Sequence, residues 1–271
     1  MARQMSPQEQ ARLESIKRSW QQKREIGNKL ARITNKIGVY SGKGGVGKTT
    51  VAVNLAVTLA QMGYSVGLMD TDIDCPNANK VLGIDEKPTA QDGIIIPPEK
   101  YGVKIISMAF FQENEEEAII WRGPMVHNAI NQFLQTTDWG DLDYIIVDLP
   151  PGTSDAPLTV MQVLSLDGFV IVTSPQDLAK LDAKRSINMV RKLNVSVLGV
   201  VENFSGEMFG SGAGEELAEE MGLSFMGRID LRPEYRDTSK PAVLSSPVIA
   251  AEYESIALAL EPALAAADTS S

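Results

Sequence analysis

The fold of this chain is decided by one stretch of sequence, Ser41-Gly42-Lys43-Gly44-Gly45-Val46-Gly47-Lys48-Thr49-Thr50. It follows a short apolar run at 37–40 and opens into a helical pattern at 51–62. A glycine-rich loop between a strand and a helix is the arrangement that binds phosphate groups. Its glycines let backbone N–H groups approach phosphate oxygens, and the helix N-terminus adds the positive end of its dipole. The stretch therefore predicts a nucleoside triphosphate site.

Three side chains of this loop have predicted roles. Lys48 is expected to neutralise the β- and γ-phosphates, and the Thr49 hydroxyl to complete a Mg²⁺ shell. Lys43 stands where the general pattern of such loops allows any residue, and it is expected to point away from its own site. From there it can reach a nucleotide held by a second copy of the chain, as an arginine finger does; the alternative is a solvated lysine. Further nucleotide contacts are predicted for Gly42, Gly44, Gly45, Val46, Gly47 and Thr50.

Composition limits the class of protein. Of the 271 residues, 44% are hydrophobic and 22% are charged, which is ordinary for a globular protein with a large core. A single cysteine, Cys75, excludes a disulfide framework, and a single histidine, His127, argues against a histidine-rich zinc site. No apolar run is long enough to span a membrane, and residues 1–40 lack the apolar segment of a signal peptide. We therefore expect a cytoplasmic protein without a membrane partner.

Charge is distributed unevenly along the chain. Residues 1–36 hold nine Lys or Arg against three Asp or Glu, a net +6, so the −10 of the whole chain leaves −16 for residues 37–271. The acidic body lacks the positive charge that binds nucleic acid, so no nucleic-acid partner is expected. The basic arm has a helical pattern with one apolar face, formed by Leu13, Ile16 and Trp20. It is expected either to dock on its own acidic body or to bind an anionic partner.

Strand and helix patterns alternate downstream of the loop. They predict a three-layer α/β fold with a mostly parallel sheet and helices on both faces. The predicted strands are 65–69, 143–148, 168–172, 196–201 and a weaker 224–226, and the predicted helices are 124–136, 177–193, 213–221 and 246–260. Region 84–120 is expected to be an insertion of short strands and loops, with a solvated acidic run from Glu113 to Glu117. The expected organisation is a basic helical extension at 1–36, a single domain at 37–265 and a frayed tail at 266–271.

Acidic residues stand at the ends of two predicted strands, where ligands bind in an open parallel sheet. Asp148 is followed by a Pro-Pro-Gly turn and is expected to hold Mg²⁺ through water. Asp70, Asp72 and Asp74 alternate, which in extended backbone puts all three on one side. Asp70 is a candidate Mg²⁺ ligand, and Asp72 is the first choice for positioning the attacking water. The alternative for each is a solvated acid in a polar loop.

The loop resembles that of the deviant P-loop family of dimeric ATPases, which includes MinD, ParA and the nitrogenase iron protein. In that family the early lysine, here Lys43, is the cross-dimer residue. Four further motifs are similar to those of the Mrp/ApbC branch of this family. They are Trp121-Arg122-Gly123-Pro124-Met125, Trp139-Gly140-Asp141-Leu142-Asp143-Tyr144, Asp148-Leu149-Pro150-Pro151-Gly152-Thr153 and Val201-Glu202-Asn203.

The resemblance runs from about residue 37 to 240 and carries several implications. It implies an ATP-binding, Mg²⁺-dependent ATPase that works as a homodimer with ATP at the subunit interface. It also implies a role as an iron–sulfur cluster carrier or scaffold, with an assembly or client protein as partner. By the family pattern, Asp70 and Asp72 belong to a first switch loop, Asp148 belongs to a second, and Asn203 contacts adenine. Turnover is expected to be slow in the single subunit, because the electrostatic stabilisation is complete only in the closed dimer.

One departure from the family bears on function. Family carriers place a Cys-x-x-Cys after the adenine-contacting asparagine, whereas here Asn203 is followed by Phe204-Ser205-Gly206-Glu207-Met208-Phe209-Gly210. A cubane cluster is normally held by four cysteine thiolates. Two copies of this chain offer two, so cluster binding by this chain is not expected. Cys75 is expected to be a small buried residue, with a cluster ligand as the lesser alternative.

Three classes of function therefore remain open. The first is an Mrp-type ATPase in iron–sulfur assembly that depends on a partner or on a cargo held elsewhere. The second is a MinD- or ParA-like positioning ATPase. The acidic C-terminal segment 248–267 and the acidic body argue against anionic lipid and DNA as its surface. The third is a regulator whose ATP cycle gates a protein partner through the basic N-terminal helix.

Overall fold

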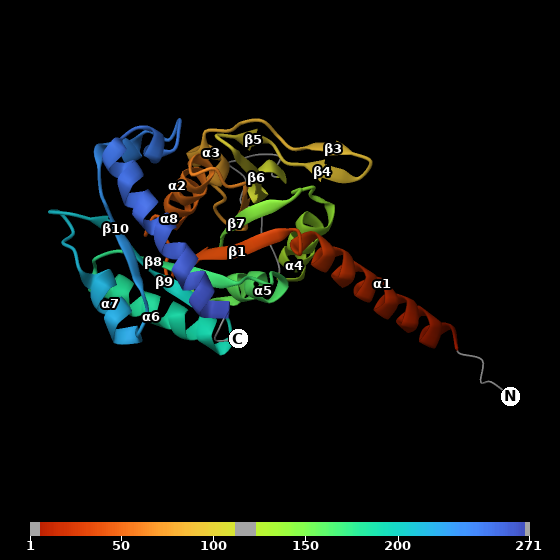
Figure 1. Ribbon diagram of the computed structural model, residues 1–271. Helices are drawn as coiled ribbons and strands as arrows, with labels where there is room; N and C mark the ends of the chain where they lie inside the picture. Colours follow the sequence, from red (N-terminus) through yellow and green to blue (C-terminus); the bar gives the residue numbers. More distant parts are fainter. Residues whose placement is uncertain (1–5, 112–122, 269–271) are drawn as a thin grey trace.

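The computed structural model describes residues 6–111 and 123–268, and a central sheet runs through it (Figure 1). The eight strands have the order β10-β9-β8-β1-β7-β2-β6-β5, and every neighbouring pair is parallel except β5 and β6. The predicted mostly parallel sheet is therefore confirmed. The strands are β1 (Ile33–Tyr40), β2 (Val66–Asp70), β5 (Glu99–Lys100), β6 (Val103–Ser107), β7 (Leu142–Asp148), β8 (Gly168–Thr173), β9 (Val197–Ser205) and β10 (Phe225–Asp230).

Helices pack on both faces of the sheet, which gives the three layers that the sequence predicts. One face carries α2 (Lys48–Gln61), α3 (Ala78–Leu82) and α8 (Pro247–Asp268). The other face carries α4 (Gly123–Thr136), α5 (Asp155–Val163), α6 (Asp177–Lys192) and α7 (Ala213–Met221). A small antiparallel pair, β3 (Thr89–Gln91) and β4 (Ile94–Ile96), lies outside the main sheet, and short 3-10 turns occupy Met108–Phe111, Pro233–Arg236 and Ala242–Leu244.

The alternation of side chains along the strands divides the core into two parts. On β7, Tyr144 and Ile146 belong to the core beneath α2 and α8, whereas Ile145 and Val147 belong to the core on the opposite face. Successive strand residues point to opposite faces of a sheet, so a strand covered on both sides reads as an unbroken apolar run. This burial fixes the carboxyl ends of β1, β7 and β2 side by side.

The structure corrects several predicted boundaries. Region 84–120 is not only an insertion, because β5 and β6 join the central sheet. β1 begins at Ile33 rather than at residue 37, α8 continues to Asp268, and the short helices α3 and α5 lie where no helix is predicted. The acidic run Glu113–Glu117 and the pair Trp121-Arg122 fall outside the described residues.

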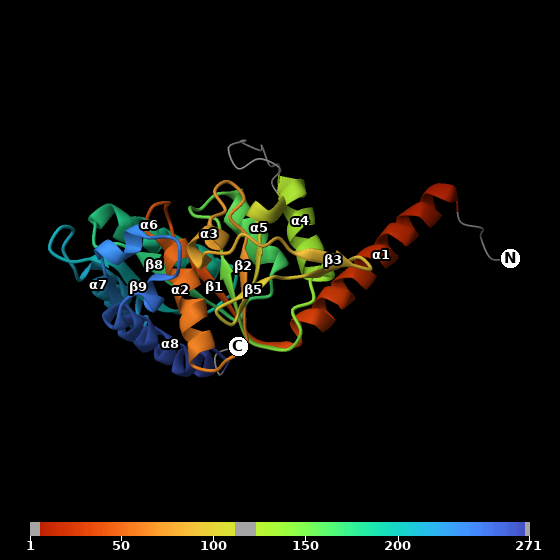
Figure 2. The same ribbon diagram turned by 90° about the horizontal axis from the view of Figure 1, so that it is seen from above.

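The N-terminal helix α1 (Pro7–Leu30) extends away from the body in both views (Figures 1 and 2). Its last turns pack on the body: Ile26 and Leu30 are buried, and the helix contacts α4. Trp20 is 71% exposed. The last turns of the arm therefore dock on the body, and the choice between docking and an anionic partner for the rest of the arm stays a prediction. Within the described residues, no helix has both the length and the apolar character needed to cross a bilayer.

Candidate nucleotide site

The glycine loop connects the end of β1 to the start of α2, as the sequence predicts. Gly45 and Gly47 have φ values of +82° and +79°, a region that favours glycine. Gly42 lies so close to α6 that a Cβ there would be 2.1 Å from the Asp182 carbonyl oxygen. Gly47 caps α2 and has no side chain to bond the first-turn N–H groups. These N–H groups and the helix dipole make the loop an anion site.

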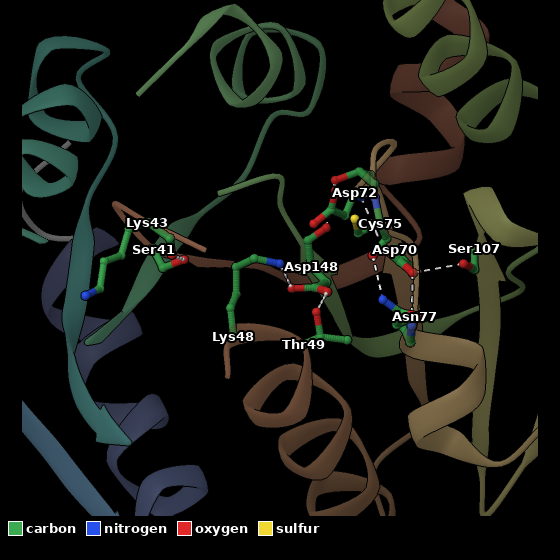
Figure 3. A network of polar contacts seen from close by, with 12 residues as sticks. Ser41, Lys43, Lys48, Thr49, Asp70, Asp72, Cys75, Asn77, Ser107 and Asp148 are labelled. Atoms are coloured by element: carbon green, nitrogen blue, oxygen red, sulfur yellow. Dashed lines mark hydrogen bonds and ion pairs between the residues drawn. The ribbon is translucent and has the colours of Figure 1, made fainter. Parts of the chain in front are cut away.

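The first two residues of α2 converge on the carboxylate at the end of β7 (Figure 3). Lys48 Nζ forms an ion pair with Asp148 Oδ1, and Thr49 Oγ1 donates a hydrogen bond of 2.7 Å to Asp148 Oδ2. The Lys48 side chain is 5% exposed and Asp148 is fully buried. The structure thus brings together the three residues predicted to bind the β- and γ-phosphates and Mg²⁺.

Lys43 behaves differently from Lys48. Figure 3 shows its side chain directed away from Lys48 and Asp148. It is half-buried, and its Nζ lies 3.4 Å from Oε1 of Gln176, the residue that caps the N-terminus of α6. The predicted outward direction is therefore observed, and the cross-dimer role stays a prediction.

The aspartates after β2 do not lie on one side, because the strand ends at Asp70 and the chain turns. Asp70 and Asp72 are buried, whereas Asp74 is exposed. Asp70 accepts hydrogen bonds from Ser107 Oγ and from the N–H groups of Asp72 and Ala78, so it fixes the loop between β2 and α3. Burial, together with the charge of Asp148, raises the pKa of Asp70 to about 7. Its role as a Mg²⁺ ligand stays a prediction.

Asp72 is the other buried carboxylate of this loop and the predicted positioner of water. It accepts a hydrogen bond of 3.2 Å from the Cys75 N–H. Burial raises the pKa of Asp72 above its ordinary value, and the charge of Lys48 opposes this. A carboxylate with a raised pKa near the phosphate-binding lysine is suited to accept a proton or to orient water.

Cys75 is exposed, which contradicts the expectation of a small buried residue. It lies in the turn between Asp72 and Asn77, where the backbone bends back toward α3. Burial of free cysteine is a statistical tendency that does not hold in an irregular loop at the surface.

The loops that follow β2 and β7, which are the two predicted switch loops, are anchored by hydrogen bonds at this site. Thr71 donates to the Asp148 carbonyl from both its N–H and its hydroxyl, at 3.0 and 2.8 Å. Gly152 N–H donates to the Ser41 carbonyl at the start of the glycine loop, at 3.0 Å. The loop after β2 is therefore bonded to the end of β7, and the loop after β7 is bonded to the start of the glycine loop.

Asn203 and Glu202, adjacent on β9, support the site from its other side. Asn203 is 1% exposed, and its Nδ2 donates to the Val46 carbonyl of the glycine loop at 2.8 Å. Its predicted contact with adenine is not tested by this geometry. Glu202 belongs to the motif Val201-Glu202-Asn203 but has no predicted role of its own, yet it is fully buried and accepts hydrogen bonds from Ser205 Oγ, Arg228 and the N–H groups of Gly212 and Gly214. Burial raises the pKa of Glu202, but these hydrogen bonds more than offset it, and the pKa lies below its ordinary value.

The residues present fit a Mg²⁺ ion bound together with a triphosphate. Mg²⁺ binds through one or two protein oxygens, several waters and substrate phosphates, and Thr49 and Asp148 supply such a hydroxyl and carboxylate. Within residues 6–111 and 123–268, no group of three or more His, Cys, Asp or Glu side chains could hold a metal ion by itself. The site is therefore suited to a metal that arrives with its nucleotide.

Comparison with known proteins decides the family. The model of the ParA group described as NUBPL iron-transfer P-loop NTPase matches residues 32–261. The chain belongs to this family. The iron–sulfur cluster carrier protein of Methanocaldococcus jannaschii is 43% identical over 236 residues, which cover 82% of this chain and 81% of that protein. The protein of the same name from Pseudomonas fragi is 42% identical over 247 residues, 84% of this chain and 86% of that one.

Solved structures agree with this assignment. The nucleotide-binding protein of Archaeoglobus fulgidus, in complex with ADP, has a TM-score of 0.71 and 34% identity over 81% of this chain and 91% of that one. The cell division ATPase MinD of Pyrococcus furiosus has a TM-score of 0.67 over 84% of this chain and 98% of that one; at 24% identity it shows the fold alone. The chain has the glycine loop with both lysines and one cysteine in its whole sequence.

Proposed function

We propose that this NUBPL-family chain is a Mg²⁺-dependent ATPase that works as a homodimeric switch in iron–sulfur cluster assembly. The observation that carries the proposal is the convergence of Lys48 and Thr49 on Asp148 at the start of α2. A buried lysine, a hydroxyl and a carboxylate at a helix N-terminus are the groups that hold a triphosphate and its metal. The ADP complex of the Archaeoglobus fulgidus protein supports a nucleotide as the ligand.

The protein's own groups perform distinct tasks in this proposal. The N–H groups at the start of α2 bind the phosphates, and Lys48 neutralises their charge as it separates from Asp148. Thr49 and Asp148 would hold Mg²⁺, and the ion would neutralise the charge that develops on the phosphates. Asp72 orients the attacking water and takes up its proton. Thr71 of the first switch loop is hydrogen-bonded to Asp148, and Gly152 of the second is hydrogen-bonded to Ser41 of the glycine loop. Hydrolysis at this site therefore changes both switch loops together.

Lys43 completes the site in the dimer. Its outward direction suits a contact with phosphates held by the second subunit. Hydrolysis is therefore slow in the single subunit, because the charge of the second subunit's lysine is missing until the two subunits close. Dimer formation then couples the nucleotide state to the surface that a client protein meets.

The named relatives are iron–sulfur cluster carriers, but the cysteines of this chain are too few to hold such a cluster. Four thiolates hold a cubane cluster, and two copies of this chain supply two, both from the exposed Cys75. We therefore place the remaining thiolates on the partner protein. Anaerobic reconstitution of the purified chain, followed by iron and sulfide analysis, distinguishes a partner-dependent role from a chain that holds a cluster by itself. No retained cluster with intact ATP binding supports the partner-dependent role, whereas a stable cluster that is lost in Cys75→Ser makes the chain a carrier by itself.

A further inference from the structure

A pocket of about 320 Å³ lies directly beside the glycine loop. It is bounded by the loop itself, by the segment between β8 and α6, by the end of β9 and by the segments that follow β9 and β10. Its lining includes Lys43, Gly44, Gln176, Phe204, Phe209 and Leu231. Its volume is at the lower end of the range for small-ligand sites. The pocket is therefore large enough for one ring system and its sugar.

The chemistry of the pocket differs from that of the phosphate site. Lys48, Thr49 and Asp148 hold charge at the start of α2, whereas Phe204, Phe209 and Leu231 offer apolar surface. Phosphates do not bind aromatic rings, but nucleobases stack on them, at roughly 1–3 kcal/mol per base. In an open parallel sheet a ligand extends along the carboxyl ends of neighbouring strands. The pocket is thus positioned to take the sugar and the base of a nucleotide whose phosphates lie at the start of α2.

Phe204 is held in this wall by an unusual backbone. Its φ is +62°, a region that bulky residues rarely adopt, so the surrounding bonds must enforce it. Asn203 before it bonds the Val46 carbonyl, and the Ser205 carbonyl after it accepts from Leu231 N–H at 2.9 Å. A Cβ on Gly47 would lie 2.8 Å from Phe204 Cζ. The ring of Phe204 is therefore fixed against the glycine loop.

Phe209 lies in a short hairpin, residues 206–210. Gly206 and Gly210 close it by exchanging two backbone hydrogen bonds, of 3.0 and 2.8 Å. Glu202 holds both flanks, because its carboxylate accepts from Ser205 on one side and from Gly212 on the other. Within the hairpin, Phe209 lines the pocket at 41% exposure, whereas Met208 is 80% exposed and lines none of it. The hairpin thus presents one aromatic ring to the pocket in a fixed position.

We propose that the hairpin 206–210 closes the base end of the nucleotide site and that Phe209 stacks on the nucleobase, with Phe204 as the inner wall. This inference rests on the proposed nucleotide binding and names the residues that read the base. It assigns a binding role to the segment that stands where the resembling carriers have a Cys-x-x-Cys.

The test compares ligands with and without a base. Calorimetric affinities for ATP and for inorganic tripolyphosphate, both with Mg²⁺, are measured for the full chain and for Phe209→Ala. We expect Phe209→Ala to weaken ATP by roughly five- to 150-fold, the range of base–aromatic stacking, and to leave tripolyphosphate unchanged. Phe209→Tyr restores ATP affinity because it keeps the ring, and the neighbouring Met208→Ala serves as the matched control with unaltered affinity.

Three results would overturn the inference, and they differ from a failure of the proposed function. Unchanged ATP affinity in Phe209→Ala, beside tight binding by the full chain, removes the stacking role and leaves nucleotide binding intact. Equal weakening of ATP and tripolyphosphate assigns the hairpin to the phosphates or to the fold. Loss of ATP-dependent dimer mass with unaltered ATP affinity assigns Phe209 to a subunit contact. A full chain that binds neither ligand overturns the proposed function itself.

Discussion

Lys48 and Asp148 form an ion pair that is closed off from solvent, one from the first turn of α2 and the other from the end of β7. A buried charge that loses its partner is costly, whereas the intact pair adds little to stability. The pair connects the glycine loop to the end of β7, where the predicted second switch loop begins. If Lys48 moves toward a bound phosphate, the Asp148 carboxylate loses its ion-pair partner and needs another cation in its place.

Replacing Lys48 by alanine is expected to abolish nucleotide binding and to lower the free energy of unfolding by about 3–5 kcal/mol, because Asp148 loses its buried partner. Calorimetry with ATP and urea unfolding measure the two effects. The double variant Lys48→Ala/Asp148→Asn regains part of the stability but none of the binding. Retained ATP affinity in Lys48→Ala would contradict the assigned site.

Lys43→Ala is expected to spare ATP binding and to reduce hydrolysis by on the order of a hundredfold or more, because the charge supplied in trans is lost. Steady-state phosphate release and ATP binding are measured side by side. The fully folded control is Lys43→Arg, which keeps the charge and part of the rate. Normal hydrolysis in Lys43→Ala would show that the lysine is only a solvated side chain.

Asp72→Asn is expected to keep ATP binding and to lower the hydrolysis rate by about 10²–10⁴-fold, the usual contribution of a general base. Asp74→Asn is the matched control, since Asp74 lies two residues away and is exposed. Single-turnover measurements with bound ATP isolate the chemical step. Equal rates in the two variants would remove Asp72 from the mechanism.

Glu202 is expected to make stability depend on acid pH. Its folded-state pKa lies below the ordinary value of 4.5, so its contribution is complete above about pH 4.5 and is lost as the pH falls through the folded pKa. Glu202→Gln should destabilise the protein by about 2–3 kcal/mol at pH 7, since hydrogen bonds to a charged group are lost. Urea unfolding of both proteins between pH 3 and 7 should show this difference shrinking toward low pH. A difference that is constant with pH would rule out the charged network.

Much of the phosphate site follows from the sequence because its parts are local. The glycine loop, β1 and α2 are contiguous, and Asp148 directly follows an apolar run that can only be a buried strand. Parallel pairing of β1 with β7 then brings Asp148 near the loop. Local pattern and sheet topology are sufficient to place Lys48, Thr49 and Asp148 together.

Other features depend on contacts between distant segments. β6 lies in a region broken by prolines, and only its pairing with β2 shows that it belongs to the main sheet. Ser107, at the end of β6, therefore reaches Asp70 without any signal in the sequence. In the sequence, Glu202 is an ordinary acid within an apolar strand. Its buried network becomes evident only in the fold, where the N–H groups of Gly212 and Gly214 donate to its carboxylate. Exposure of Cys75 likewise follows from the turn after β2.

The central claim is an ATP-driven change between one subunit and two. Sedimentation velocity of the slowly hydrolysing Asp72→Asn chain, with Mg²⁺ and either ATP or ADP, tests it most directly. We expect the mass of a dimer with ATP, the mass of a monomer with ADP, and loss of the ATP-dependent dimer when Lys43→Ala is added. The same mass with both nucleotides, at concentrations where both are bound, would rule out nucleotide-dependent dimerisation.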